Sequence, residues 1–264
     1  MLIAKHRQKR PSIILLGGSN VAFGFNSEMI QEALDLPVIN TGLGVGLGLK
    51  FMLDNTSKYL AEGDILVIAP EYEHFFNKFV YGKTDLAVLF YLDPSISTDF
   101  DMKQFKIMID CTKDLIPLPR FFPKQINKQS YHASCFNEYG DYVCHWTMPS
   151  HPYILHASLA DFKTINTNFL DYYENAVTAL RSQGIQVVII PPSLAETSYN
   201  TIKERLLPLF SEFEKRDLSF SISPQEFVYP DSLFFDICYH LGYEGVLIRT
   251  NQLITLMKTG GFVR

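Results

Sequence analysis

The sequence predicts an α/β protein, organised as a three-layer α/β/α sandwich around a parallel sheet with a large insertion after the third strand. Two observations lead to this fold class. Short apolar runs alternate with longer segments of helical periodicity, which is the pattern of βαβ units. About ninety residues, 71–160, separate the third apolar run from the next regular helix, which is far more than an ordinary crossover needs.

The apolar runs are the predicted strands, because each is short, rich in Ile, Val and Leu, and bounded by turn residues. They cover residues 12–18, 37–43, 64–70 and 185–192, and a further short strand is expected near Phe227. Runs that are apolar on both faces are typical of parallel strands buried between two layers of helices.

Helical periodicity fills the segments between these runs. The expected helices begin near residue 27 and then cover residues 47–60, 101–116, 161–183, 201–215 and 243–258. Asn26 and Ser27 are good N-cap residues, and Gly63 and Gly184 are typical helix stops. We therefore expect one domain over residues 1–264, in which residues 71–160 form a cap over the carboxyl edge of the sheet.

The composition limits the possible partners. The chain has 264 residues, 47% of them hydrophobic, and a formal net charge of -5, which argues against a nucleic-acid partner. The basic cluster at residues 5–10 is interpreted as a solvated tail in preference to a membrane-proximal stub. No run reaches the roughly 18 apolar residues of a membrane span. The chain as written is expected to be soluble. The sequence leaves the compartment open, and an extracytoplasmic or cell-envelope place is the alternative if an upstream anchor was removed.

The number and spacing of the four cysteines do not indicate a metal site or a disulfide framework. They are Cys111, Cys135, Cys144 and Cys238, without a Cys-x-x-Cys spacing, so buried free thiols are expected. Cys135 and Cys144 with His145 are the alternative, a metal site, but no second ligand pair of zinc-like spacing accompanies them. We expect neither a metal nor an organic cofactor.

Chemistry is expected first at "GGSN", residues 17–20. Ser19 follows the first predicted strand, and ligands of parallel sheets bind where strands end. This segment alone is also compatible with a plain turn. Asp236 and His240 lie four residues apart in "DICYHL", just before the last helix. A serine becomes a nucleophile when an imidazole accepts its proton and a carboxylate orients that imidazole.

These motifs resemble those of the SGNH (GDSL-like) hydrolases. In that family the catalytic serine follows the first strand in a Gly-Asp-Ser or Gly-x-Ser block, and an Asp-x-x-His block precedes the last helix. The resemblance implies a flavodoxin-like sheet, with Ser19 as nucleophile, His240 as general base and Asp236 as its orienting carboxylate. The Asp–His spacing here is one residue longer than usual. Nε2 of His240 is expected within about 3–3.5 Å of Ser19 Oγ.

The remaining family blocks concern the oxyanion hole. "INTGLGVG" resembles the second block, which implies that the N–H groups of Ser19 and Gly44 bind the oxyanion, with Gly42 as the next choice. The third block should supply an asparagine, but "APEYEHF" stands there. Loss of one oxyanion donor typically costs ~10²–10³ in rate. Asn20 is the candidate substitute, and Glu71 is interpreted as a binding carboxylate, a support for the cap or a plain strand end.

"PEYEHF" also resembles a bacterial branch whose proteins acylate or deacylate cell-surface polysaccharides. Glu71, Tyr72 and Asn137 are therefore candidate substrate-binding residues, although core packing and turn formation also explain "FNEYGD" around Asn137. The predicted function is a serine esterase or O-acyltransferase acting on a small-molecule or carbohydrate ester. The alternative is a weak or inactive binding protein on the same scaffold. A nucleotide loop is rejected, because the glycines at 42–48 alternate strictly.

Overall fold

A central parallel sheet forms the middle layer of the computed structural model, which describes residues 11–77, 79–115 and 132–263. The four-stranded sheet has the order β2-β1-β3-β4, and its strands are β1 Ile13–Gly17, β2 Val38–Asn40, β3 Ile65–Ala69 and β4 Gln186–Ile189. A separate parallel pair joins β5 Leu194–Ala195 to β6 Val228–Tyr229. The four predicted strands and the short one near Phe227 are confirmed.

The register of the two central strands fixes the site. Every residue of β1 and β3 is buried, as expected for strands covered on both faces. Ile13 pairs with Ile65 and Gly17 with Ala69, so the two strands end side by side. The residues that follow them are therefore brought together at the carboxyl edge.

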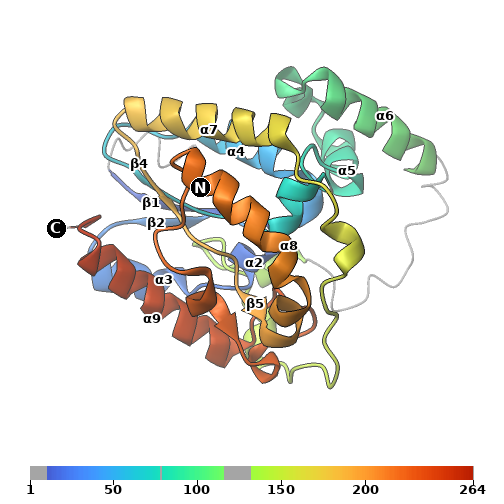
Figure 1. Ribbon diagram of the computed structural model, residues 1–264. Helices are drawn as coiled ribbons and strands as arrows, with labels where there is room; N and C mark the ends of the chain where they lie inside the picture. Colours follow the sequence, from blue (N-terminus) through green and yellow to red (C-terminus); the bar gives the residue numbers. More distant parts are fainter. Residues whose placement is uncertain (1–10, 78, 116–131, 264) are drawn as a thin grey trace.

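Helices cover both faces of the sheet. The described helices are α2 Ser19–Ala22, α3 Ser27–Leu34, α4 Leu49–Ser57, α5 Thr84–Leu92, α6 Met102–Leu115, α7 Thr167–Ser182, α8 Glu196–Lys215 and α9 Tyr243–Thr259. In Figure 1, α4 and α7 lie on one side of the sheet and α3 and α9 on the other. The predicted three-layer α/β/α sandwich is thus confirmed.

Two helix starts differ from the sequence prediction. The helix expected from residue 161 begins at Thr167, where the side chain of Asn166 caps it by accepting from Phe169 N. The helix expected from residue 201 begins at Glu196. The first turn of this helix is polar and so shows no apolar period in the sequence. Its Ser198 is nevertheless fully buried and accepts a hydrogen bond from Ala157 N.

The insertion has two parts that lie in different places. Helices α5 and α6 pack on each other to one side of the sandwich (Figure 1), and α5 was not predicted. The segment from residue 132 onward crosses the carboxyl edge, where Asn40 N donates to Tyr139 O and Tyr142 N donates to Ala22 O. This second part therefore lies at the carboxyl edge, where the cap is expected. The basic cluster at residues 5–10 lies outside the described residues.

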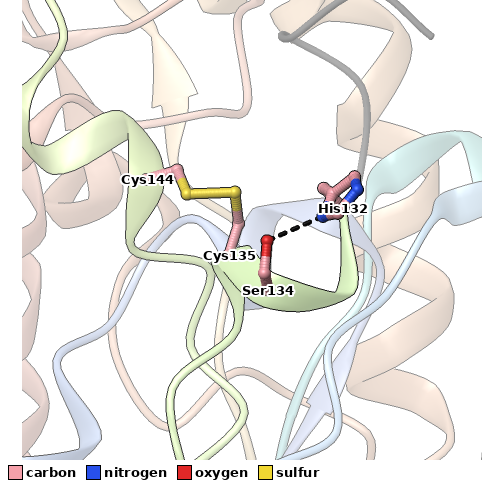
Figure 2. The surroundings of a disulfide bond; sticks show 4 residues. All are labelled: His132, Ser134, Cys135 and Cys144. Carbon is pink, nitrogen blue, oxygen red and sulfur yellow. Dashed lines mark hydrogen bonds between the residues drawn. A yellow bond between two sulfur atoms is a disulfide. The ribbon is translucent and has the colours of Figure 1, made fainter.

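Cys135 and Cys144 form a disulfide, so the expectation of free thiols is wrong for this pair (Figure 2). The chain reverses at Gly140, which has a φ of 96°, and Phe136 pairs with Tyr142 in an antiparallel bridge. This reversal brings the two cysteines together, and sulfurs bonded to each other are not available to a metal. Cys238 remains a buried thiol, and burial raises its pKa to about 12.

Over residues 11–77, 79–115 and 132–263, no helix combines the length and the apolar character that crossing a bilayer requires.

Candidate active site

Ser19 lies at the turn between β1 and α2. A side chain on Gly17 would meet the carbonyl oxygen of Ala69 at 2.4 Å, so the close approach of β1 and β3 requires glycine there. Ser19 begins α2 and is 6% exposed. Its side chain borders a cavity of about 360 Å³. The predicted nucleophile therefore lies beside a space that a ligand could enter.

The cavity is formed by segments far apart in the sequence. Strand ends, the insertion and the loop before α9 all contribute, namely Ser19, Val45, Glu71, Glu73, Phe79, Asp161 and residues 155–158 and 237–239. The predicted residues Ser19 and Glu71 are thus brought together on one wall. Glu73 accepts a hydrogen bond of 2.7 Å from the Tyr239 hydroxyl, which ties the strand end to the loop before α9.

The carboxylate of Glu71 contacts the Ser19 turn. Its Oε2 accepts from Gly18 N at 3.2 Å, and its Oε1 accepts from Asn20 N at 3.1 Å. The Ser19 hydroxyl donates to Oε1 over a longer distance of 3.5 Å. Glu71 is only 2% exposed. It follows β3 at the position of the third family block, so a carboxylate stands where the resemblance implies an asparagine.

His74 lies behind Glu71. Its Nδ1 is 3.1 Å from the carbonyl oxygen of Glu71 and 3.7 Å from its carboxylate. Burial lowers the pKa of His74, although the charge of Glu71 opposes this shift. The imidazole is therefore neutral at physiological pH and does not balance the carboxylate.

Asp236 and His240 form the second part of the site. Oδ1 of Asp236 lies 2.7 Å from Nδ1 of His240. Burial acts to raise the pKa of Asp236, but the hydrogen bond and charge of His240 outweigh it and the pKa is lowered. Phe234 and Leu241 pair as an antiparallel bridge, so the intervening residues form a tight reversal in which Asp236 and His240 face each other. The longer Asp–His spacing therefore still gives the predicted pair.

The His240 ring packs against α2. It stacks on Phe23 with ring centroids 4.0 Å apart and an interplanar angle of 7°. Nε2 of His240 is buried and has no hydrogen-bond partner among the described residues. The expected hydrogen bond to Ser19 Oγ is thus absent, and the Ser19 hydroxyl is directed to Glu71 instead. Catalytic contacts are often loose without substrate.

His145 is a further buried histidine beside this pair. Its ring lies 4.7 Å from that of Phe23 and 5.7 Å from that of Tyr142, and neither of its nitrogens has a partner within the described residues. Burial, assisted by the nearby His240, lowers the pKa of His145 to about 4. His145 is therefore neutral in the folded protein at pH values where an unfolded histidine is protonated.

The titration of His145 predicts an acid-sensitive stability. Between pH 7 and pH 4 the unfolded chain takes up a proton near 6.5 and the folded chain only near 4, so the free energy of unfolding falls by up to about 3 kcal/mol. Urea unfolding at a series of pH values measures this loss. A His145→Phe variant keeps an aromatic ring and should lose less stability over the same range. An equal loss in both proteins contradicts the prediction.

Asn20 stabilises the turn between β1 and α2 through hydrogen bonds to buried groups. Its side-chain amide donates to Ala69 O at 2.9 Å, and its side-chain oxygen accepts from Arg249 at 3.0 Å. Arg249 also donates to the Asn20 carbonyl at 2.7 Å and is fully buried against Phe25. Burial lowers the pKa of Arg249 to about 10. Since both ends of the Asn20 amide are engaged in the core, this placement does not support the predicted role as an oxyanion donor.

The glycine loop after β2 is covered by α5. Side chains on Gly44 or Gly46 would approach a carboxylate oxygen of Asp85 at 2.8 Å and 2.4 Å. Burial raises the pKa of Asp85, opposed by a hydrogen bond from the Gly46 backbone. Gly42 N donates to the side chain of Asn40, so this N–H is already engaged. Gly44 remains the better candidate for the oxyanion donor.

Two predicted binding residues lie away from the Ser19 cavity. Tyr72 is buried in the core between Phe210 and Phe220, and burial raises its pKa. Asn137 donates to Asp141 and lines a separate cavity of about 330 Å³. The structure therefore gives Tyr72 packing contacts and Asn137 turn-forming contacts, and for Asn137 this is the alternative that the sequence left open.

Sequence reasoning missed Phe23 and Arg249, and it considered His145 only as a metal ligand beside Cys135 and Cys144. Phe23 could have been found by its place one helical turn after Ser19, since Phe23 N donates to Ser19 O. His145 and Arg249 come from the insertion and the last helix, and their neighbours in the sequence give no sign of the contacts they make.

Neither a metal-binding cluster among the described residues nor a match to a known protein adds to this site. In the described parts of the chain, no group of three or more His, Cys, Asp or Glu side chains is arranged to hold a metal ion. No protein-family model matches the chain, and no curated protein matches it either, so no family membership follows for the arrangement of Ser19, Glu71, Asp236 and His240.

Proposed function

We propose that the protein is an SGNH-type serine hydrolase or acyltransferase that acts on an ester. In the proposed reaction Ser19 Oγ gives its proton to Nε2 of His240 and forms a bond to the ester carbonyl carbon. The alkoxide leaves with the proton from His240, and an acyl-enzyme remains on Ser19. Water or an acceptor hydroxyl then gives its proton to His240 and bonds to the acyl carbon, and His240 returns that proton to Ser19 Oγ as the bond between Ser19 and the acyl group breaks.

The observation that carries this proposal is the Asp236–His240 pair, whose imidazole stacks on Phe23, the residue that follows the helix that Ser19 begins. A proton held on Nδ1 towards Asp236 leaves the lone pair on Nε2, the atom that has no partner among the described residues. The loop that bears His240 also lines the Ser19 cavity, through residues 237–239. The proposal requires the Ser19 hydroxyl to leave Glu71 and come within hydrogen-bond distance of Nε2 of His240.

Covalent labelling tests the proposed nucleophile. An alkyl fluorophosphonate should add one adduct to the protein, because an activated serine attacks phosphorus and displaces fluoride. Intact-mass and peptide mass spectrometry should locate the adduct on Ser19, and the Ser19→Ala variant should carry none. Equal labelling of Ser19→Ala, or an adduct on another residue alone, would reject Ser19 as the nucleophile.

The second candidate is a carbohydrate-binding protein with little or no catalysis. Glu71 favours it, since a negative charge about 4 Å from an oxyanion costs about 4 kcal/mol at an effective dielectric constant near 20. This corresponds to roughly 10³-fold in rate. Turnover of a short p-nitrophenyl ester that depends on Ser19 would exclude this candidate.

The substrate class follows from the resemblance and from the cavity. An acylated carbohydrate or small-molecule ester is proposed, because polar oxygen atoms of Ser19, Glu71 and Glu73 share a cavity of about 360 Å³ with the apolar side chains of Val45 and Phe79. The Cys135–Cys144 disulfide supports a place in an oxidising compartment, where such bonds persist.

A further inference from the structure

We propose that Glu71 restrains the reactivity of Ser19, and that Gly18 and Glu71 form a coupled pair. This inference rests on the proposed function, in which Ser19 is the nucleophile. One buried carboxylate contacts three successive residues of the turn, at 3.2 Å from Gly18 N, 3.5 Å from Ser19 Oγ and 3.1 Å from Asn20 N. It therefore stands beside the atom that attacks the ester.

The charge of Glu71 opposes the reaction. As Ser19 Oγ bonds to the ester carbon, negative charge develops on the carbonyl oxygen, one bond beyond that carbon. Serine hydrolases aim hydrogen-bond donors at this oxygen, whereas an ionised carboxylate only accepts. Among the described residues, neither neighbouring basic side chain donates a hydrogen bond to the Glu71 carboxylate. Nδ1 of His74 lies 3.1 Å from the Glu71 carbonyl oxygen and 3.7 Å from its carboxylate. Arg249 donates to Asn20, Pro191 and Ser193, so its charge reaches Glu71 only without direct contact.

Gly18 is what makes room for this carboxylate. A Cβ atom on Gly18 would lie 2.4 Å and 2.5 Å from the two carboxylate oxygens of Glu71 and 2.7 Å from their carbon. Glu71 is 2% exposed, so it has little space to withdraw. A side chain at position 18 is therefore incompatible with Glu71 in its present place, and the two positions must change together.

Replacement of Glu71 should accelerate the enzyme. In Glu71→Asn a shorter amide donor takes the place of the carboxylate, and in Glu71→Gln the length is kept and the charge removed. With p-nitrophenyl acetate, kcat is expected to rise about 10–100-fold while KM stays within about twofold, since the oxyanion exists only in the transition state. The rise is informative, because loss of a merely structural residue lowers kcat.

A double-mutant cycle tests the coupling. Gly18→Ala alone should lower the midpoint of thermal unfolding, because the methyl group meets the carboxylate of Glu71. In the Glu71→Asn background the same substitution should lower the midpoint much less, because the shorter side chain leaves space for the methyl group. Additive effects of the two substitutions would overturn the coupling of positions 18 and 71.

The outcomes separate this inference from the proposed function. If Ser19 is labelled but kcat falls or stays constant in both Glu71 variants, the restraint is overturned and the function stands. If Ser19→Ala and Ser19→Ala/Glu71→Asn hydrolyse the ester as fast as their parents, the proposed function itself is wrong. Two different replacements at Glu71 ensure that poor folding of one variant does not decide the result, and thermal unfolding reports folding of each.

Discussion

Replacement of His240 by alanine is expected to lower the Ser19-dependent turnover of a p-nitrophenyl ester by about 10²–10⁴-fold. The imidazole pairs with the Asp236 carboxylate and stacks on Phe23, the residue that follows the helix that Ser19 begins. Without it, Ser19 must give up its proton to water or to Glu71, which already accepts two backbone N–H groups. Steady-state rates from pH 6 to pH 9 measure the loss.

Asp236→Asn serves as the matched control for this variant. It keeps the size of the side chain but removes the carboxylate that fixes the proton on Nδ1 of His240. A large loss, of up to about 10⁴-fold, is expected because the imidazole can then present the wrong tautomer to Ser19. Should His240→Ala retain the parent rate while remaining folded, the proposed role of the pair would have to be abandoned.

Replacement of Arg249 by methionine is expected to lower the free energy of unfolding by about 3–5 kcal/mol. Arg249 is fully buried, and its guanidinium donates to the carbonyl and side chain of Asn20 and to the Pro191 carbonyl. Methionine fills part of the volume but leaves these acceptors without a donor. Since stabilities of whole domains are about 5–15 kcal/mol, the variant should be close to unfolding at 37 °C.

Urea unfolding of Arg249→Met measures this loss of stability, and Arg181→Met is the control in which an exposed arginine is replaced. Arg181 pairs with Asp217, whose side chain is 95% exposed, and exposed pairs contribute about 0–1 kcal/mol. Its replacement should therefore cost little. A loss below about 1 kcal/mol in Arg249→Met would show that the buried hydrogen bonds to the Ser19 turn contribute little to stability.

The central sheet could be predicted from the sequence because local signals determine it. The strands β1 and β3 are continuous apolar runs that end in Gly17 and Ala69, and burial on both faces is what such runs require. The positions of Ser19 and Glu71 follow directly from the ends of these strands. The Asp236–His240 pair was also predictable, since both residues lie in one short reversal.

Contacts between distant segments could not be predicted in the same way. Nothing near Cys135 indicates a bond to Cys144, because the reversal at Gly140 depends on Asp141, which accepts hydrogen bonds from Ser27 and Asn40. Helix α5 has apolar residues on every side, so no periodic face marks its packing. The contacts of Asn20 could not be predicted either, because its partner Arg249 is 229 residues away.

The disulfide also has a practical consequence for laboratory work. It closes the loop whose Tyr142 ring lies 4.4 Å from that of Phe23, and Phe23 in turn supports His240. Dithiothreitol or a similar additive in a purification buffer would open this loop and loosen the support of the imidazole. A sample handled in this way can test inactive although Ser19, Asp236 and His240 are intact, so assays should use reductant-free protein whose two sulfurs have been verified as bonded by mass spectrometry.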